Sequence, residues 1–295
     1  MSVQDQKTDQ VINDALRQIS HIATLPEITL KIIELVEDQS STAQDLHTVI
    51  QNDPALCSRV LKVVNSSFYG LPGQIGSINR AIVLLGLNAV KNIAISASVN
   101  KLFRGGELSQ GFSGRALWTH SISTAVTAKL IANELKIGMT DEIFLGGLMH
   151  DIGMMVELQY DRETFVEIVG AVKVDSDGAP EVSMLDIERE MIGADHQQFG
   201  EGICHKWKFP KSLAQIAGNH HNPLDLPPDE RTLAAIVHVA DRLVGGMGPG
   251  AFRFDLPDLT ISHDVLDELK LTSQTVDRLS DGLDERIEEA MTVMY

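Results

Sequence analysis

Five of the ten histidines, together with two aspartates, are spaced so that they could hold metal ions. They include two adjacent pairs, His150-Asp151 and His220-His221. The gaps between successive groups run from 20 to 45 residues, long enough for most of a helix and its return. The groups can therefore project from separate helices into one bundle interior, as in known helical metal sites. The set consists of His120, His150, Asp151, His196, His220, His221 and Asp241.

The ligand types indicate a transition metal. Imidazole and carboxylate together favour Fe, Mn, Ni or Zn over Ca or Mg, and no cysteine is needed. Neighbouring residues on a helix differ by about 100° in direction, so an adjacent pair can clamp one ion or bridge two. Two ions could hold a phosphate and lower the pKa of a bound water. Spacing alone leaves both a metal site and ordinary core or surface histidines open.

The remaining histidines have simpler interpretations. His21, His47, His205 and His263 are predicted to be ordinary core or surface residues. His238 lies three residues before Asp241, so it could share a helix face with Asp241 and support the ligands.

Helical periodicity runs through most of the chain, and strand signals are weak. We expect Asp53-Pro54 and Ser77 to begin helices, and a bend near Gly86. The predicted helices cover Asp9–Ile22, 28–36, 42–50, Ala55–Val64, Ile78–Leu102, Leu117–Leu135, Asp141–Leu158, Met184–Gly193, Gln197–Lys206, Ser212–His220 and Thr232–Val244, with one or two acidic helices after Ser262.

These elements predict an all-α protein with two packed helical subdomains. The polar, Gly-rich stretch Arg104–Gly114 is the expected joint. We place an N-terminal helical subdomain at 1–110, a bundle that carries the His and Asp set at 111–250, and an acidic helical extension at 251–295.

Composition restricts the function classes. The 24 basic and 41 acidic residues give a formal charge of −17, which disfavours direct nucleic-acid and anionic-membrane binding. There are two cysteines, no apolar run long enough to span a bilayer, and no signal-peptide pattern at the start. We therefore expect a cytoplasmic protein.

Several motifs together resemble the HDOD family, a branch of the HD phosphohydrolase superfamily, between Leu25 and Val244. The resemblance implies an all-α fold whose second subdomain is an HD-type bundle, a bacterial signalling role and a protein partner. Many HDOD domains are regulatory modules without the HD catalytic residues. The motifs are Leu25-Pro26, NDPALCSRVLKVVNSSFYG at Asn52–Gly70, INRAIVLLG at Ile78–Gly86, LGGLMHDIG at Leu145–Gly153, GADHQQFGEGICHKWKFP at Gly193–Pro210, NHH at Asn219–His221 and HVADRL at His238–Leu243.

The resemblance also assigns roles to the polar set. The first four ligands of the HD signature match His120, His150, Asp151 and Asp241, of which His150 and Asp151 would be catalytic in an enzyme. The extra ligands of the HD-GYP cyclic dinucleotide phosphodiesterases resemble His196, His220 and His221.

Two departures separate the chain from those phosphodiesterases. Their HD pair is usually followed by Gly-Lys, whereas this chain has Gly153-Met154, and the GYP segment is missing after His221. In place of that lysine, a phosphate could be bound by Arg115, Lys129 or Arg242. Each of them can also be interpreted as an ordinary surface residue.

Three functions remain as hypotheses. The favoured one is a regulatory module with a metal site of one or two ions and little or no catalysis. The alternative is a metal-dependent phosphohydrolase acting on a nucleotide, cyclic dinucleotide or other phosphoester, with Asp151 bridging two ions. A third, weaker one is redox or oxygen sensing by a di-iron centre. The segment NSSFYG could form a partner or ligand surface, although Phe68 and Tyr69 packing on the core is the simpler interpretation.

Overall fold

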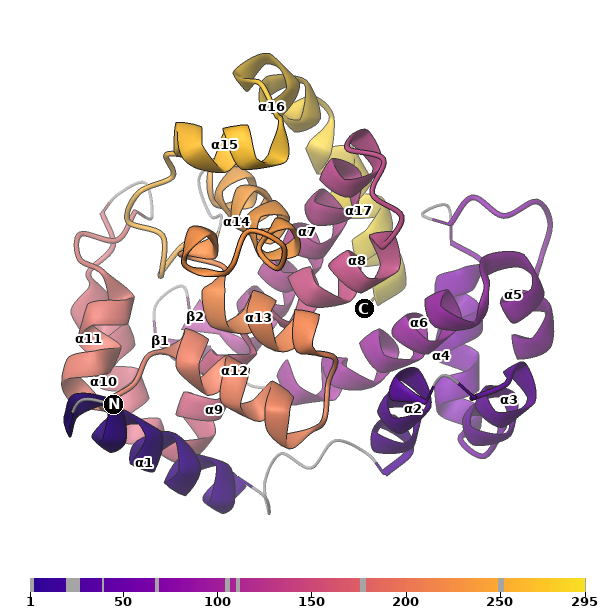
Figure 1. Ribbon diagram of the computed structural model, residues 1–295, viewed down its shortest axis with the longest axis horizontal. Helices are drawn as coiled ribbons and strands as arrows, with labels where there is room; N and C mark the ends of the chain where they lie inside the picture. The colour runs from indigo at the N-terminus through magenta and orange to yellow at the C-terminus, as the bar shows by residue number, and fades with distance from the viewer. Residues whose placement is uncertain are drawn as a thin grey trace.

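The structure is a computed structural model that describes residues 3–19, 27–38, 40–66, 69–103, 107–109, 112–175, 179–248 and 252–294. His21, Leu25-Pro26 and Phe68 lie outside these ranges. The described chain is almost entirely helical, as predicted, and forms two neighbouring groups of helices (Figure 1). The smaller group contains α2 (Glu27–Glu37), α3 (Ala43–Gln51), α4 (Pro54–Val64), α5 (Ile78–Leu85) and α6 (Leu87–Val99).

The helix starts predicted at Asp53-Pro54 and Ser77 are confirmed. Thr42 caps α3 in a capping box with Asp45. Asp53 accepts a hydrogen bond from the Leu56 amide, with Pro54 in the first turn of α4. Ser77 caps α5, and Gly86, at a φ of 91°, separates α5 from α6. A left-handed φ of this kind favours glycine, so the break follows directly from the sequence.

The joint between the groups contains the only strands among the described residues. A short 3-10 helix, Asn100–Phe103, precedes β1 (Glu107–Ser109), which pairs antiparallel with β2 (Phe112–Ser113). Phe112 is buried among Phe165, Phe252 and Phe254, at ring-centroid distances of 5.3–5.4 Å. The joint is therefore anchored in the larger group by an aromatic cluster.

The larger group surrounds α7, whose buried residues lie on every side of the helix. Several of its polar residues, among them His120, Ser121 and Thr124, are accordingly buried against other helices. The members are α7 (Gly114–Glu134), α8 (Thr140–Met149), α9 (Ile152–Tyr160), α10 (Arg162–Val172), α11 (Met184–Met191), α12 (His196–Lys206), α13 (Lys211–Asn219), α14 (Thr232–Gly245), α15 (His263–Leu269), α16 (Ser273–Ser280) and α17 (Leu283–Met294), with a 3-10 turn at Pro223–Asp225.

Two helix predictions in this group are wrong, and one helix was missed. The helix predicted over Asp141–Leu158 is two helices, α8 and α9, which meet at His150 and Asp151. Hydrophobic residues continue through the junction, so periodicity alone does not reveal it. Helix α10 was not predicted, and the C-terminal tail forms three helices rather than one or two.

Both ends of the described chain pack on the larger group. Helix α1 (Val3–Gln18) lies against α9 and α12, and the Thr8 hydroxyl donates to the carbonyl oxygen of Gly193 (Figure 1). Helix α17 lies against α7. Buried apolar side chains form one continuous core from Ala15 to Ala290. No described helix combines the length and the apolar character needed to cross a bilayer.

Candidate metal centre

The structure brings all seven predicted side chains to one buried place in the larger group. They come from α7, the α8–α9 junction, the start of α12, the end of α13 and α14. Six of the seven residues are at most 2% exposed, and His221 is partly exposed. These groups converge as the sequence analysis expected.

Asp151 lies between two sets of histidines. One carboxylate oxygen, Oδ2, is 3.2 Å from His150 Nε2 and 3.6 Å from His120 Nε2. The other oxygen, Oδ1, is 3.3 Å from His220 Nε2 and 3.9 Å from His196 Nε2. Each oxygen therefore faces a different set, as a carboxylate that bridges two ions would.

The first set is completed by Asp241. Its Oδ1 is 3.0 Å from His120 Nε2 and 3.6 Å from His150 Nε2, and the two imidazole nitrogens are 3.3 Å apart. Potential ligand atoms of His120, His150 and Asp241 lie within 4.8 Å of one another, close enough to surround one ion.

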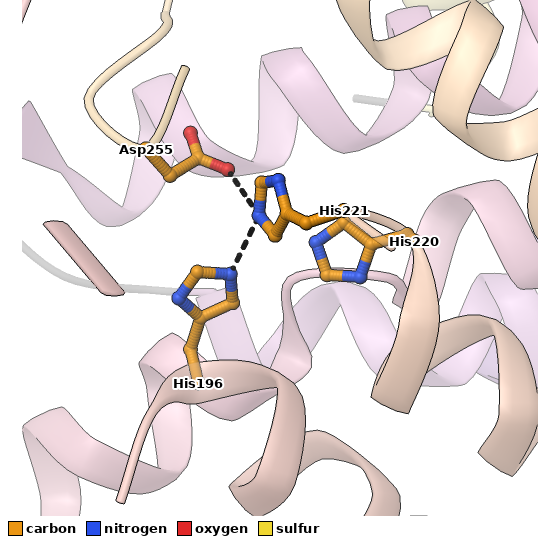
Figure 2. Close-up of side chains that lie close together, drawn as sticks. All are labelled: His196, His220, His221 and Asp255. Atoms are coloured by element: carbon orange, nitrogen blue, oxygen red, sulfur yellow. Dashed lines mark hydrogen bonds and ion pairs between the residues drawn. The ribbon is translucent and has the colours of Figure 1, made fainter. Parts of the chain in front are cut away.

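The second set contains a residue that the sequence analysis missed, Asp255. In Figure 2, His221 lies between Asp255 and His196, with His220 beside it. The distances are 3.2 Å from His221 Nε2 to Asp255 Oδ2 and 3.0 Å from His221 Nε2 to His196 Nε2. Potential ligand atoms of His196, His220, His221 and Asp255 also lie within 4.8 Å of one another.

Hydrogen bonds behind the rings fix how three histidines face the centre. His150 Nδ1 lies 2.7 Å from the Gly147 carbonyl oxygen, and His220 Nδ1 lies 3.1 Å from that of Ala217. His196 Nδ1 lies 2.8 Å from Glu188 Oε2. These oxygens only accept, so each Nδ1 carries a proton and donates it, which leaves Nε2 as the nitrogen that faces the centre and could bind a metal.

Among the described residues, the buried carboxylate oxygens of the centre have no well-oriented hydrogen-bond donor. Both carboxylate oxygens of Asp151, Asp241 and Asp255 are buried without a well-oriented hydrogen bond, although imidazole nitrogens are near. Leaving so many buried carboxylate oxygens unsatisfied is costly, and a cation among them removes that cost. The donor set therefore fits first-row transition ions, which can bind phosphate oxygens and acidify a bound water.

Burial and the neighbouring charged groups shift the pKa values of several side chains of the centre, in different directions. Burial raises the pKa of Asp255, and Asp151 and Asp241 reinforce the shift, to about 7. Burial opposes the charged form of His150, yet Asp151 and Asp241 outweigh it and raise the pKa of His150 well above its usual value. Burial, with His220 and His196, lowers the pKa of His221 well below its usual value.

Two glutamates behind His196 were also missed. Glu188 on α11 accepts hydrogen bonds from both the His196 ring and its backbone amide. Burial and the neighbouring Glu188 raise the pKa of Glu157 well above its usual value, which favours the neutral form of its carboxyl group. Glu188 lies one turn from Met184 and Leu185 on the buried face of α11, and a glutamate on an apolar helix face was the available signal.

We expect Glu188→Gln to weaken metal binding about 10- to 100-fold, because losing the carboxylate behind a histidine ligand lowers its basicity and frees its ring. Competition against a colorimetric chelator measures the affinity. Glu190→Gln is the matched control, since Glu190 is exposed on the same helix. Equal affinities for the two variants would contradict this role of Glu188.

Glycines allow the helices to approach closely enough to form the centre. A Cβ on Gly147 would lie 2.7 Å from the Ala125 Cα on α7. A Cβ on Gly153 would lie 1.7 Å from the carbonyl oxygen of His196. The glycines on either side of His150-Asp151 thus let α8 and α9 press against the backbones that carry His120 and His196.

Asp255 reaches the centre because the loop before α15 is held by aromatic residues. Phe252 and Phe254 contact Phe112, and the Phe252 ring centroid is 5.3 Å from that of His120. The signal in the sequence was an aspartate flanked by Phe254 and Leu256 in a chain with only 9 phenylalanines. The segment assigned to the 251–295 extension thus contributes to the same bundle.

The other histidines separate into two kinds. His238 does not bond Asp241, and its Nδ1 lies 2.7 Å from the carbonyl oxygen of His220, where it supports the backbone of a ligand residue. His205 and His263 are exposed, and His47 is half-buried in the smaller group.

Of the three predicted phosphate-binding cations, only Arg242 lies beside the centre. Arg115 is exposed on α7, five residues or about 7.5 Å along the axis from His120. Lys129 Nζ lies 3.1 Å from Asp141 Oδ1 and 4.4 Å from the Tyr69 ring centroid, between the two helix groups. Arg242 follows Asp241 on α14 and lines a pocket with His221.

We expect Lys129→Gln to lower the free energy of unfolding by about 1 kcal/mol, because it removes an ion pair and a cation–π contact. Metal content should not change. Chemical denaturation with elemental analysis measures both, and Lys7→Gln on the exposed face of α1 is the charge-matched control. Loss of metal from Lys129→Gln alone would contradict this assignment.

The sequence matches the HDOD domain over residues 22–223. That range includes His120, His150, Asp151, His196, His220 and His221, and ends before Asp241 and Asp255. A Treponema pallidum protein of uncharacterised function is 23% identical over 245 residues, which are 83% of this chain and 46% of that protein. The chain therefore spans about half the length of the curated relative it matches.

Solved structures share the fold. A Marinobacter aquaeolei protein, provisionally named for signal transduction, has a TM-score of 0.76 and 22% identity, covering 99% of this chain and 66% of its own. A Shewanella amazonensis protein, provisionally named a phosphohydrolase, has a TM-score of 0.71 and 21% identity, with coverages of 96% and 98%. A Geobacter sulfurreducens HDOD domain protein of unknown function has a TM-score of 0.66 and 21% identity, with coverages of 94% and 98%.

Proposed function

The chain belongs to the HDOD family, and on that premise we propose that it is a bacterial regulatory module built around a resident dinuclear transition-metal centre with little or no turnover. One observation carries the proposal: the two oxygens of the buried Asp151 face two separate sets of imidazole and carboxylate ligands. His120, His150 and Asp241 would hold one ion. The second would be held by His196, His220, His221 and Asp255.

Limited access to the centre supports a regulatory rather than a catalytic role. Asp151 and His150, the catalytic candidates, are fully buried. Met154, at the position where the related phosphodiesterases usually carry a lysine, is also fully buried and offers no charge to an anion. A stable ion held this deeply would stabilise one arrangement of the α8–α9 junction, because metal binding adds to folding free energy.

The smaller helix group would be the platform for a signalling protein partner. Val83 is 73% exposed at the end of α5, next to the half-exposed Leu84. Tyr69, from the segment NSSFYG, contacts Lys129 and Asp141 of the larger group. Helix α8 begins beside that contact and ends at His150, so it connects the interface of the two groups to the centre.

A metal-dependent phosphohydrolase is the second candidate, favoured by the complete ligand set and the bridging position of Asp151. To compare the two, the protein loaded with Mn, Fe or Ni is assayed on a panel of nucleotides, cyclic dinucleotides and simple phosphoesters. We expect no turnover above that of His150→Ala. Enzyme-like hydrolysis that is lost in His150→Ala would replace the regulatory proposal with the hydrolase.

A further inference from the structure

A small polar pocket opens beside the candidate metal centre. Its volume is about 250 Å³, and its lining includes His221, Asn222, Asp225, His238, Arg242 and Thr260. His221 belongs to both the pocket and the centre, and 8% of its side chain is exposed, whereas the other described ligand residues are at most 2% exposed. The pocket is therefore where the partly exposed ligand of the centre meets solvent.

Helix geometry places a cation in this pocket. Asp241 and Arg242 are consecutive on α14, so their side chains diverge by about 100°. Asp241 faces the centre, and Arg242 lines the pocket. The guanidinium is thus next to the centre without belonging to its ligand set.

Within the described part of the chain, two nitrogens of the Arg242 guanidinium lack a hydrogen-bond acceptor. Its Nη1 lies 3.0 Å from His238 Nδ1, but that nitrogen also lies 2.7 Å from the carbonyl oxygen of His220. A carbonyl oxygen only accepts, so His238 Nδ1 must donate to it and cannot accept from Arg242. The buried Nε of Arg242 also has no hydrogen-bond partner among the described residues.

Three of the carboxylates near Arg242 are engaged elsewhere, whereas the exposed Asp225 lines the same pocket. Asp241 and Asp255 face the histidines of the centre, and Asp258 accepts a hydrogen bond from the Thr260 amide. A partly buried guanidinium whose N–H groups lack acceptors binds oxyanions well, because two of its N–H groups can donate to two phosphate oxygens at once. The exposed Asn222 and Thr260 at the rim can add hydrogen-bond donors.

The size of the pocket indicates which part of a ligand it takes. Sites for whole organic ligands usually span about 300–1,000 Å³, so a pocket of about 250 Å³ suits a phosphate group with the rest of the ligand outside. We propose that this pocket binds the phosphate group of a small ligand through Arg242 and brings it against His221. The inference names the ligand class of the proposed regulatory function, and its second half rests on that function.

The test measures binding of inorganic phosphate by calorimetry to the full chain, as purified and after chelator treatment. We expect Arg242→Gln to weaken phosphate binding about 10-fold or more, since a hydrogen-bonded charge is lost. Arg242→Lys should weaken it less, because the charge remains without the fork. Arg115→Gln removes an equal charge from an exposed site and should bind phosphate as the wild type does.

Metal content separates this inference from the proposed function. If Arg242→Gln and Arg242→Lys bind phosphate as tightly as the wild type, or the wild type binds none at millimolar phosphate, the pocket assignment is overturned whatever the metal content. If the wild type carries no metal and Arg242→Gln still weakens phosphate binding, the pocket stands and the metal-centred function fails.

Discussion

Asp151→Asn is expected to remove both metal ions at once. The substitution preserves the size of the side chain but removes the charge that faces both histidine sets. An amide is a weak metal ligand for transition ions and cannot bridge them as a carboxylate does. Elemental analysis of protein purified without added metal should therefore fall from about two ions per chain to near zero.

Two further variants test the bridging position of Asp151. Asp241→Asn alters only the first set and Asp255→Asn only the second, so each should lose about one ion and retain the other. Asp281→Asn makes the same charge change at an exposed position and should keep full metal content. An Asp151→Asn protein that loses no more metal than Asp255→Asn would show that Asp151 does not bridge.

Among Gly147, Gly153 and Gly170, we expect Gly153→Ala to destabilise the protein most. The new Cβ would lie 1.7 Å from the His196 carbonyl oxygen and 2.8 Å from the Gly200 amide nitrogen, both of which are backbone atoms. Neither can move without shifting α12. We expect the free energy of unfolding to fall by about 3 kcal/mol or more, with loss of metal because His196 moves.

Gly170→Ala provides the opposite expectation from the same chemical change. Gly170 is exposed inside α10 with no atom within 4 Å of the added Cβ. Alanine in a helix interior should stabilise the protein by about 0.5–1 kcal/mol. Thermal and urea unfolding measure the stability of the two variants, and elemental analysis measures their metal content. A Gly153→Ala protein as stable as the wild type would contradict the close packing of α9 on α12.

The convergence of the histidines and aspartates was predictable in part because residues separated by a helix and its return can project into one bundle interior. Spacing alone left ordinary core or surface histidines open, and the family resemblance favoured the candidate ligand set. His120, His150 and Asp241 do lie together. Helix starts were predictable for a local reason, since Asp53 and Ser77 carry their own capping oxygens. Such features depend on a few neighbouring residues.

What the sequence did not reveal depends on distant contacts. Hydrophobic periodicity runs through His150-Asp151, but one helix ends there and the next begins, because α8 and α9 pack against different helices. Asp255 sits in a loop whose course is set by Phe252 and Phe254 packing on Phe112. The role of Glu188 can be recognised only from the structure, in which α11 places its carboxylate against the His196 ring. None of these three features can be predicted from the few residues on either side of it in the sequence.

The same distinction applies to the cations. Arg115, Lys129 and Arg242 were equivalent as sequence features, because each is a single basic residue near a predicted ligand. Packing separates them: Lys129 is engaged by Asp141 and Tyr69, whereas Arg242 is placed at the pocket of His221. The choice among such residues requires the position of every neighbouring acceptor.

Anomalous X-ray diffraction from metal-replete crystals, collected at the absorption edge of the bound metal, tests the central claim most directly. We expect two peaks, one on each side of Asp151, each about 2.0–2.2 Å from imidazole nitrogens of its own set. The first should contact His120 and His150, and the second His196 and His220. Crystals without a peak among these residues, or with one peak that Asp151 does not touch, would contradict a bridged two-ion centre.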